Sequence, residues 1–447
     1  MSANTQAPTL PLPPRDITAL AATLLELDDM LVSCMRCGFC QSVCPVYGAS
    51  LREADVTRGK IALLENLARH IITDAESVND KLNRCLLCGS CQANCPSGVR
   101  IMDIFLRARS IVRGYLGLSP IKKIIFRGLL VRPGLFDGFM SLSKTFQGLL
   151  IKDNHNAAGT CQAPLFSAIT GNRHFPALAK KPFHATTHAL KEKAGSGRPV
   201  AALFPGCVSD KIFPQLAQAT LRILRKHQTG IFLPSGQNCC GIPALASGDR
   251  KTFVQLVRQN LAIFNSEPFD YLLTPCATCA ATIKEIWPGF REDFSPEEQA
   301  TLKAMSEKAI DITAFTVDVL KAELPESAQG GRRVTYHDAC HLNKSLNVSS
   351  QPRQILKSLP GLEFVEMPEA DRCCGSGGSF TLAYYDLSKK IGQRKRDNIV
   401  SVKPDLVAAA CPACMMQIMD MLSRNGDNIQ VKHVAELYAD SLSGVDS

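Results

Sequence analysis

Short apolar runs alternate with longer amphipathic segments through the second half of the chain. The amphipathic segments, for instance Leu216–His227 and Phe253–Phe264, read as helices. The short runs have the length and composition of buried strands. Strands that alternate with helices predict a parallel sheet, with site residues at the strand ends and loop starts. The predicted strands are Val200–Phe204, Ile231–Leu233, Tyr271–Leu273, Val334–Tyr336, Leu362–Val365 and Leu406–Ala410.

The first part of the chain carries a helical pattern instead. Ile61, Leu64, Ala68 and Ile71 form an apolar stripe at helical spacing. The stripe lies between two tight groups of cysteines. It therefore predicts that the cysteines belong to a mainly helical domain.

A short amphipathic stretch precedes Pro133 in the middle of the chain. Its apolar side consists of Ile121, Ile124, Ile125 and Leu129, and its basic side of Lys122, Lys123 and Arg127. Residues 100–198 hold 16 Lys and Arg against 4 Asp and Glu, a net charge of +12, whereas the whole chain carries +9. This charge favours contact with an acidic partner or an anionic membrane surface. The alternative is a helix that faces the core and has a solvated basic side. No DNA-binding motif supports a nucleic-acid partner.

Nineteen cysteines in 447 residues require an explanation. A secreted disulfide framework suits short chains with a signal peptide, and the N-terminus MSANTQAPTLPLPPRD lacks the basic and apolar regions of such a signal. No apolar run is long enough to predict a transmembrane helix. We therefore expect reduced, metal-bound cysteines in the cytoplasm, with peripheral contact to the inner face of the cytoplasmic membrane as an option.

Eight of the cysteines form two copies of the pattern C-x2-C-x2-C-x3-C-P. This is the pattern of bacterial two-cluster ferredoxins, in which the fourth cysteine of each copy ligates the other cluster. Two zinc sites are the alternative, but zinc usually takes its four ligands as two separated pairs. The predicted ligands are Cys34, Cys37, Cys40 and Cys95 for the first [4Fe–4S] cluster, and Cys85, Cys88, Cys91 and Cys44 for the second.

Ten further cysteines fall into a repeat. Each copy has a single cysteine, then a Cys-Cys-Gly sequence and then a C-x2-C pair, with nearly the same spacing in both copies. Each copy therefore offers five thiolates, one more than a cubane cluster needs. The first set is Cys207, Cys239, Cys240, Cys276 and Cys279, and the second is Cys340, Cys373, Cys374, Cys411 and Cys414.

These patterns predict an α+β multidomain protein. A helical two-cluster ferredoxin domain is expected over residues 1–115, and a basic linker that contacts a partner or a membrane over 116–198. Two repeated α/β cysteine-rich domains are expected over 199–330 and 331–447.

Several sequence segments resemble one protein family over almost the whole chain. GFCQSVCPVY, TRGKIALLEN and RCLLCGSCQANCPSGV are similar to the iron–sulfur subunits of glycolate oxidase and related lactate dehydrogenases. PGC, NCCG, YHDACHL, RCCGSGG and CPAC are similar to the paired C-terminal CCG domains of that family. The resemblance extends more distantly to the heterodisulfide reductase subunits and to one of the subunits of anaerobic glycerol-3-phosphate dehydrogenase.

The resemblance implies one or two further clusters of the non-cubane [4Fe–4S] type in the C-terminal sets. The alternative is that one or both sets hold no cluster and serve as structural or redox-active thiols. His337 and His341 flank Cys340, and hydrogen bonding to a cluster or its ligands is favoured over direct ligation. Cys161 belongs to neither pattern and is read as a free thiol.

The chain carries no dinucleotide-binding fingerprint such as G-x-G-x-x-G. The resemblance therefore implies that a separate FAD-containing subunit oxidises glycolate or lactate. This chain would relay the electrons to a quinone or a membrane-bound acceptor and would carry no catalytic residue for substrate oxidation. The alternative is a catalytic subunit like heterodisulfide reductase, which uses a C-terminal cluster to reduce a disulfide or a quinone.

Overall fold

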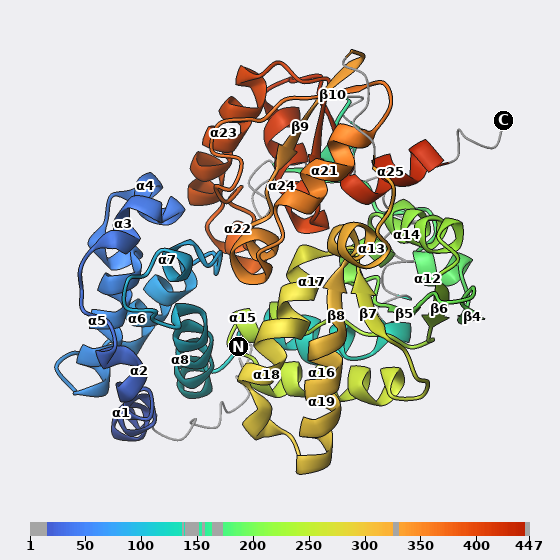
Figure 1. Cartoon of the computed structure of the whole chain (residues 1–447). Coiled ribbons are helices and arrows are strands. Elements are labelled where there is room, and N and C mark those ends of the chain that lie inside the picture. Colours follow the sequence, from blue (N-terminus) through green and yellow to red (C-terminus); the bar gives the residue numbers. More distant parts are fainter. Residues whose placement is uncertain are drawn as a thin grey trace, which may run out of the picture.

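A computed structural model of the chain describes residues 16–135, 138, 152–153, 157–162, 173–324 and 330–442. Figure 1 shows three bodies in chain order: a helical N-terminal domain in blue, an α/β unit in green and yellow, and a second α/β unit in orange and red. The predicted fold class is therefore confirmed. Among the described residues no helix is long and apolar enough to cross a membrane.

The N-terminal domain is built from short helices around one apolar centre. Helix α5 packs against α1 and α6, and α8 packs against α1 and α6. Ile61 and Leu64 of α5 are fully buried there, as the apolar stripe predicted. The elements are α1 (Ile17–Leu25), α2 (Asp28–Val32), α3 (Phe39–Val43), α4 (Pro45–Ser50), η1 (Glu53–Asp55), α5 (Thr57–Ala68), α6 (Ala75–Asn83), α7 (Ser90–Ala93) and α8 (Ile101–Leu116).

The stripe is shorter than predicted. Helix α5 ends at Ala68, and His70 takes a left-handed backbone conformation with φ of 57°. The chain therefore turns away from the helix axis before Ile71, whose side chain is 69% exposed. The prediction that Ile71 belongs to the buried stripe was wrong.

A connecting region follows the N-terminal domain. It includes a small antiparallel sheet in the order β1-β2-β3, and β3 packs against helix α24 (Pro412–Arg424) of the second α/β unit. The described elements are α9 (Pro120–Lys123), η2 (Ile124–Leu130), β1 (Lys152–Asp153), β2 (Thr160–Gln162), β3 (His174–Pro176) and α12 (Phe183–Thr186).

The first α/β unit contains a five-stranded sheet in the order β4-β6-β5-β7-β8. Strand β4 is antiparallel to β6, and the other pairs are parallel. The strands are β4 (Leu190–Glu192), β5 (Val200–Leu203), β6 (Gly230–Leu233), β7 (Tyr271–Thr274) and β8 (Ala309–Asp311). The helices are α13 (Cys207–Lys211), α14 (Pro214–Lys226), α15 (Ile242–Ala246), α16 (Arg250–Phe264), α17 (Ala277–Ala281), η4 (Thr282–Ile286), α18 (Trp287–Gly289), η5 (Arg291–Asp293), α19 (Pro296–Lys308), α20 (Ile312–Ala314) and η6 (Phe315–Val319).

The second unit repeats this topology in a parallel sheet of order β10-β9-β11-β12. This order matches β6-β5-β7-β8 of the first unit strand for strand. The two copies of the cysteine repeat therefore have the same fold. The strands are β9 (Arg332–His337), β10 (Leu362–Phe364), β11 (Leu406–Ala409) and β12 (Gln430–His433). The helices are η7 (His341–Ser345), α21 (Ser350–Ser358), α22 (Ser379–Ala383), α23 (Tyr385–Ser401), α24 and α25 (Val434–Leu442).

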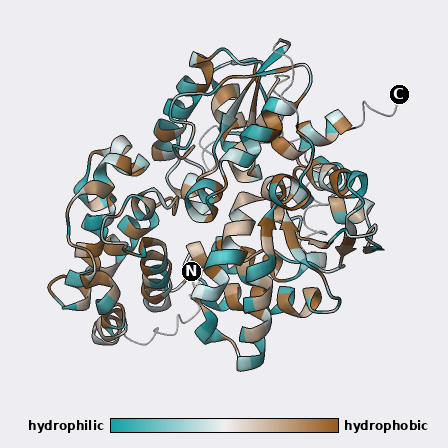
Figure 2. Ribbon diagram, viewed as in Figure 1, coloured by the Kyte–Doolittle hydropathy of each residue, from teal (hydrophilic) through white to brown (hydrophobic). Residues whose placement is uncertain are grey.

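Both sheets are covered by helices, as their hydropathy requires. All residues of β6 and β11 are buried, because a parallel strand with helices on both faces has no exposed side. In Figure 2 brown is prominent in the central strands, whereas the surrounding helices mix teal and brown residues. The last helix, α25, packs against α14 of the first unit, so the two units interlock.

The contrast between Ile61 and Ile71 gives a test of this core. We expect Ile61→Ala to lower the free energy of unfolding by about 2–5 kcal/mol, because it leaves a cavity in a fully packed site. Ile71→Ala serves as the control and should change it by less than about 0.5 kcal/mol. Denaturant unfolding of the full chain under anaerobic conditions measures both. Equal losses would contradict the described packing.

Candidate metal centres

In the first ferredoxin-type group, Cys34 and Cys37 precede α3 and Cys40 lies in its first turn. Burial raises the pKa of the Cys40 thiol, and the neighbouring Cys34 and Cys37 thiols raise it further, so the three thiols lie close together. Gly38 begins α3 with φ of 89°, a conformation that few other residues adopt. Helix α7, which leads to Cys95, packs against α3.

The second group gathers all four predicted ligands around one pocket. Cys44, Cys85, Cys88 and Cys91 line it together. Burial raises the pKa of Cys91, and the other three thiols raise it further, so the four sulfurs share one site. Cys44 comes from the other copy of the motif, as the ferredoxin pattern predicts.

Backbone and cationic groups surround this pocket. The backbone N–H of Tyr47 and that of Leu87 donate to the sulfurs of Cys44 and Cys85, both at 3.4 Å. The ammonium group of Lys60 is buried beside the pocket; burial lowers its pKa, and Cys85 and Cys44 partly offset this. Donors and a cation placed in this way stabilise thiolates or a cluster of net negative charge.

The five cysteines of the first unit also come together. The sulfurs of Cys207 and Cys239 are 3.8 Å apart. The thiol of Cys240 pairs with those of Cys239 and Cys279, and Cys279 pairs with Cys276. They meet because Cys207, the Cys239-Cys240 pair and Cys276 follow β5, β6 and β7, and the carboxyl ends of parallel strands lie at one edge of a sheet.

Buried donors fix the Cys239-Cys240 loop. The indole N–H of Trp287 donates to the carbonyl of Cys240 at 3.0 Å, and the side-chain amide of Asn260 donates to the carbonyl of Cys239 at 3.0 Å. Both side chains are fully buried. Two buried side-chain donors thus fix the backbone of this loop.

The second unit gathers its set in the same manner. The thiol of Cys340 contacts that of Cys373, and the thiol of Cys374 contacts those of Cys373 and Cys414. Cys414 in turn contacts Cys411. The backbone N–H of Gly375 donates to the sulfur of Cys373 at 3.5 Å.

Two contacts join the sets to one another. The thiol of Cys88, in the ferredoxin domain, pairs with Cys373 of the second unit. The thiol of Cys411, in the second unit, pairs with Cys276 of the first. The thiols from Cys44 to Cys207 therefore form one continuous line that starts in the ferredoxin domain, crosses the second unit and ends in the first.

His341 stabilises the place where these parts meet. Its Nε2 lies 2.9 Å from the carbonyl oxygen of Leu87 in the ferredoxin domain, and its Nδ1 lies 3.1 Å from the hydroxyl of Thr278 in the first unit. Thr278 in turn lies 3.4 Å from the sulfur of Cys411. Both ring nitrogens are thus engaged in hydrogen bonds at the junction of the three bodies.

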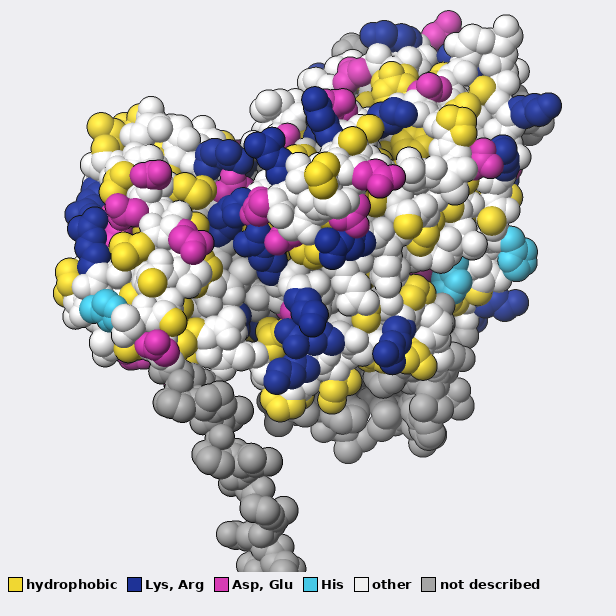
Figure 3. Space-filling model, turned by 90° about the horizontal axis from the view of Figure 1, so that it is seen from below, with side chains coloured by type: hydrophobic (Ala, Val, Ile, Leu, Met, Phe, Trp, Pro, Cys, Tyr) yellow, Lys and Arg dark blue, Asp and Glu magenta, His cyan; other side chains and the backbone are white. Residues whose placement is uncertain are grey.

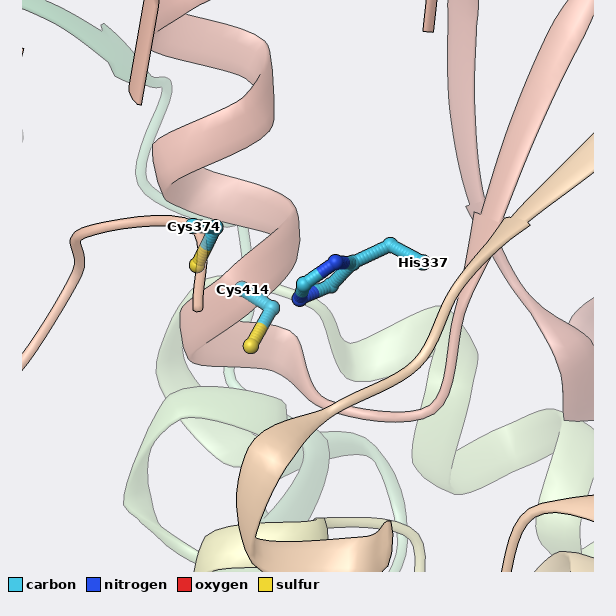
Figure 4. A group of neighbouring side chains, drawn as sticks. All are labelled: His337, Cys374 and Cys414. Carbon is cyan, nitrogen blue, oxygen red and sulfur yellow. The ribbon is translucent and has the colours of Figure 1, made fainter. Parts of the chain in front are cut away.

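His337 is placed differently. It ends β9 and is fully buried, and neither ring nitrogen has a hydrogen-bond partner in the described part of the chain. A ring nitrogen of His337 and the sulfurs of Cys374 and Cys414 lie within 4.8 Å of one another, as Figure 4 shows. Burial lowers the pKa of His337 to about 3, so its imidazole is neutral.

This donor set fits iron–sulfur clusters. Thiolate is the soft ligand that such clusters use, and neutral imidazole also binds iron. Nine of the ten cysteines in the two α/β units are buried, and negative charge on buried thiolates is costly unless a metal offsets it. The chemistry of these donor sets therefore fits iron–sulfur clusters.

A cavity of about 270 Å³ lies at the first-unit end of the thiol line. Cys207 and Cys239 line it together with His184, Asp210 and Lys211. Asp210 lies 2.8 Å from Nδ1 of His184 and 2.9 Å from the ammonium of Lys211. Burial acts to raise the pKa of Asp210, but these partners outweigh it and hold the pKa below its usual value.

Family models match the three cysteine-bearing parts of the chain. Residues 30–99 match the 4Fe-4S dicluster domain, and residues 201–284 and 334–419 each match the cysteine-rich CCG domain. The probable glycolate oxidase iron-sulfur subunit of Bacillus subtilis (strain 168) is 30% identical over 418 residues, which cover 92% of this chain and 94% of that protein. The chain belongs to the family of glycolate oxidase iron–sulfur subunits.

Other relatives match about half of the chain. Lactate utilization protein A of Geobacillus sp. (strain WCH70) is 36% identical over 237 residues, covering 53% of this chain and 97% of that protein. One of the subunits of the fumarate reductase (CoM/CoB) of Methanothermobacter marburgensis is 34% identical over 235 residues, covering 52% of this chain and 45% of that protein. The resemblance seen in the sequence is confirmed, and the chain is an iron–sulfur component of an oxidoreductase. The domain limits and the assignment of individual ligands stay predictions.

Lys60 and Arg109 are among the buried basic residues of the described chain that sequence reasoning missed. Lys60 adjoins the apolar stripe of α5, and Arg109 of α8 is buried among apolar residues. The guanidinium of Arg109 donates to the carbonyls of Leu82 and Cys85 in its own domain and to that of Ala246 in the first unit, at 2.6, 2.7 and 2.8 Å. A basic residue on an apolar helix face was the available signal.

The glycine after each Cys-Cys pair gives a test of the site. Gly375 has φ of 90°, and a Cβ there would lie 2.9 Å from the carbonyl oxygen of Ser388. We expect Gly375→Ala to lower the iron content of the purified protein, because the Cys373-Cys374 loop must shift to avoid this clash.

Gly426→Ala is the matched control. Gly426 has φ of 72° but open space around the added Cβ, so its substitution costs only the backbone strain of about 1–2 kcal/mol. Iron and sulfide analysis compares the two variants. Equal iron contents in both would contradict a metal-holding role for this loop.

Proposed function

We propose that this chain is the electron-transferring subunit of a glycolate- or lactate-oxidising dehydrogenase. A partner subunit that contains FAD would oxidise the 2-hydroxy acid, and this chain would carry the electrons to a quinone or another membrane-bound acceptor. The observation that carries the proposal is the continuous line of thiols from Cys44 to Cys207, with contacts at Cys88–Cys373 and Cys411–Cys276. Clusters held along such a line lie next to one another, as electron transfer requires.

The ligand sets follow the four groups. Two [4Fe–4S] clusters would bind in the ferredoxin domain, with Cys44 and Cys95 exchanged between the two motifs. Each α/β unit would hold a further non-cubane [4Fe–4S] cluster through its five cysteines. The donor sets and the shared Cys-Cys-Gly loops support this assignment.

We assign the acceptor end of the line to Cys207. Of the ten cysteines in the two units, all within the described residues, only Cys207 is partly exposed. A quinone takes up protons as well as electrons, and the hydrogen-bonded group of His184, Asp210 and Lys211 can exchange protons beside this thiol. A larger cavity of about 660 Å³ beside α22 and α23 is lined by no cysteine among the described residues, so it suits an acceptor less well.

An apolar surface adjoins the acceptor cavity. Ile121, Ile124 and Leu135 are more than half exposed, whereas Leu130 and Pro133 of the same segment line the cavity. Figure 3 shows Lys and Arg side chains near hydrophobic ones on the face seen from below. Exposed apolar residues beside basic ones favour peripheral contact with an anionic membrane surface, from which a lipid-soluble quinone would enter.

The same cavity favours a second function. Cys207 and Cys239 at 3.8 Å could exchange electrons with a disulfide substrate instead of a quinone. In that case the chain would be a catalytic subunit like a heterodisulfide reductase. The two functions differ in which molecule reoxidises the reduced protein.

Iron analysis tests the cluster content of the protein. Anaerobic iron and acid-labile sulfide determination, combined with EPR of the reduced and oxidised states, should give roughly sixteen irons when each α/β unit holds a cluster, and roughly twelve when only one of them does. Roughly eight irons with cubane signals alone would leave both α/β units without clusters and would contradict a relay through them.

The acceptor site is tested by reoxidation kinetics. Reduced full-length protein is mixed rapidly with a soluble ubiquinone analogue or a low-molecular-weight disulfide. Reoxidation is followed as the recovery of the cluster absorbance that reduction had bleached. We expect the quinone to reoxidise the wild type, and Cys207→Ala to slow this at least tenfold, because the last member of the line is lost.

Cys161→Ala is the control, since Cys161 is buried and belongs to none of the four sets. It should reoxidise at the wild-type rate. Fast reoxidation by the disulfide alone would favour the reductase function. A Cys207→Ala protein with full iron content and wild-type quinone kinetics would place the acceptor elsewhere.

A further inference from the structure

The unsatisfied ring of His337 is the feature that the proposed relay leaves unexplained. Buried polar groups in native proteins nearly always have a hydrogen-bond partner, and one without a partner destabilises the fold. At His337 both ring nitrogens are buried without one among the described residues. Both nitrogens therefore have a capacity for a hydrogen bond or a metal that the described chain does not use.

The surroundings of the ring indicate which group would use this capacity. The sulfurs of Cys374 and Cys414 lie within 4.8 Å of a ring nitrogen and of each other, and Figure 4 shows the ring edge directed toward Cys414. All three side chains are buried. One imidazole and two thiols at this separation form a ligand set for a soft metal ion or for iron in a cluster.

The first unit shows that the fold itself does not require a histidine here. Phe204 and His337 stand three residues before Cys207 and Cys340, and each follows or ends the central strand of its sheet. In the first unit Leu203 pairs with Leu273, so the next residue, Phe204, stands level with the position two residues before Cys276. In the second unit His337 pairs with Ala409, which also stands two residues before a cysteine, Cys411. Each of these positions thus stands at the same height relative to the C-x2-C pair.

In the first unit this position is filled by hydrocarbon. Phe204 is fully buried and packs against the ring of Phe264, with centroids 5.8 Å apart. An aromatic ring of similar size therefore satisfies the packing. The histidine contributes something that packing does not explain, namely its nitrogens.

We propose that His337 is a direct ligand of the iron held by the second unit, alongside Cys374 and Cys414. The two units are then chemically different: the first offers thiolates only, and the second offers thiolates and one neutral imidazole. An imidazole that takes a coordination position from one of the five thiolates puts neutral nitrogen in place of anionic sulfur, which raises the reduction potential of a cluster, as histidine ligation does in Rieske centres. The second unit should have the higher potential of the two. This inference rests on the proposed function only in that the second unit binds iron.

The test uses the full-length protein, purified anaerobically and labelled with 15N in histidine only. We expect pulsed EPR of the paramagnetic C-terminal cluster to show a strong nitrogen coupling that changes with the label, and His337→Phe to abolish it. His337→Phe copies the residue of the first unit, so it keeps the packing. The variant His337→Cys should retain the iron and lower the midpoint potential of the cluster, because an anionic thiolate ligand then replaces the neutral imidazole.

The rival role for His337 is a hydrogen bond to a cluster sulfide. His337→Asn keeps a donor but removes the imidazole, so it would preserve the wild-type potential under the rival role and change it under ligation. Only weak histidine couplings in the wild type would overturn the proposal, and this result does not depend on whether the variant folds. A second unit that holds no metal would also overturn it.

The outcome is separable from that of the proposed function. The iron count and the quinone kinetics of the wild type decide whether the chain is a relay. The origin of the nitrogen coupling decides whether His337 is a ligand. A working relay whose cluster shows no histidine coupling would reject the ligand and keep the relay.

Discussion

Buried thiols in mutual contact are the constraint on which the rest of this structure depends. Their pKa values are driven apart: contacts with Cys276 and Cys414 lower the pKa of Cys411 far below its usual value, whereas Cys374 and Cys411 raise that of Cys414. Only some of the thiols can therefore ionise while no metal is present. A metal removes this limit because it offsets the charge of every thiolate that it binds, so metal binding and the stability of this region are linked.

The two parallel sheets meet this constraint through their topology. Each sheet brings three cysteine-bearing loops to its carboxyl edge, and the order of the four strands that the two sheets share is the same. The edges of the two units face each other, which is why Cys276 and Cys411 are neighbours although they belong to different units. Arg109 joins the ferredoxin domain to the first unit, and His341 joins all three bodies. The relative placement of the thiol sets therefore depends on a few buried hydrogen bonds.

Much of this architecture could be predicted from the sequence, because its signals are local. The six predicted strands agree with β5, β6, β7, β9, β10 and β11 to within two residues at either end. Three of the four edge strands of the two large sheets were missed, namely β4, β8 and β12. Strands β4 and β8 are only three residues long, and the first three residues of β12 are only partly buried, so none of them stands out as an apolar run. The contacts between units could not be predicted. Cys88 and Cys373 are far apart in the chain, and spacing within a motif says nothing about which motif packs against another.

The orphaned nitrogens of His337 show a further limit of sequence reasoning. In the sequence, His337 and His341 are equivalent neighbours of Cys340, and the pattern favours hydrogen bonding for both. The fold separates them. Helical geometry after Cys340 turns His341 toward Leu87 and Thr278, whereas His337 is the last residue of β9 and points into the thiol set. A repeat of fold thus does not imply a repeat of chemistry. Because the second unit lies between the ferredoxin domain and the first unit, any difference in its potential would act on every electron that passes along the line.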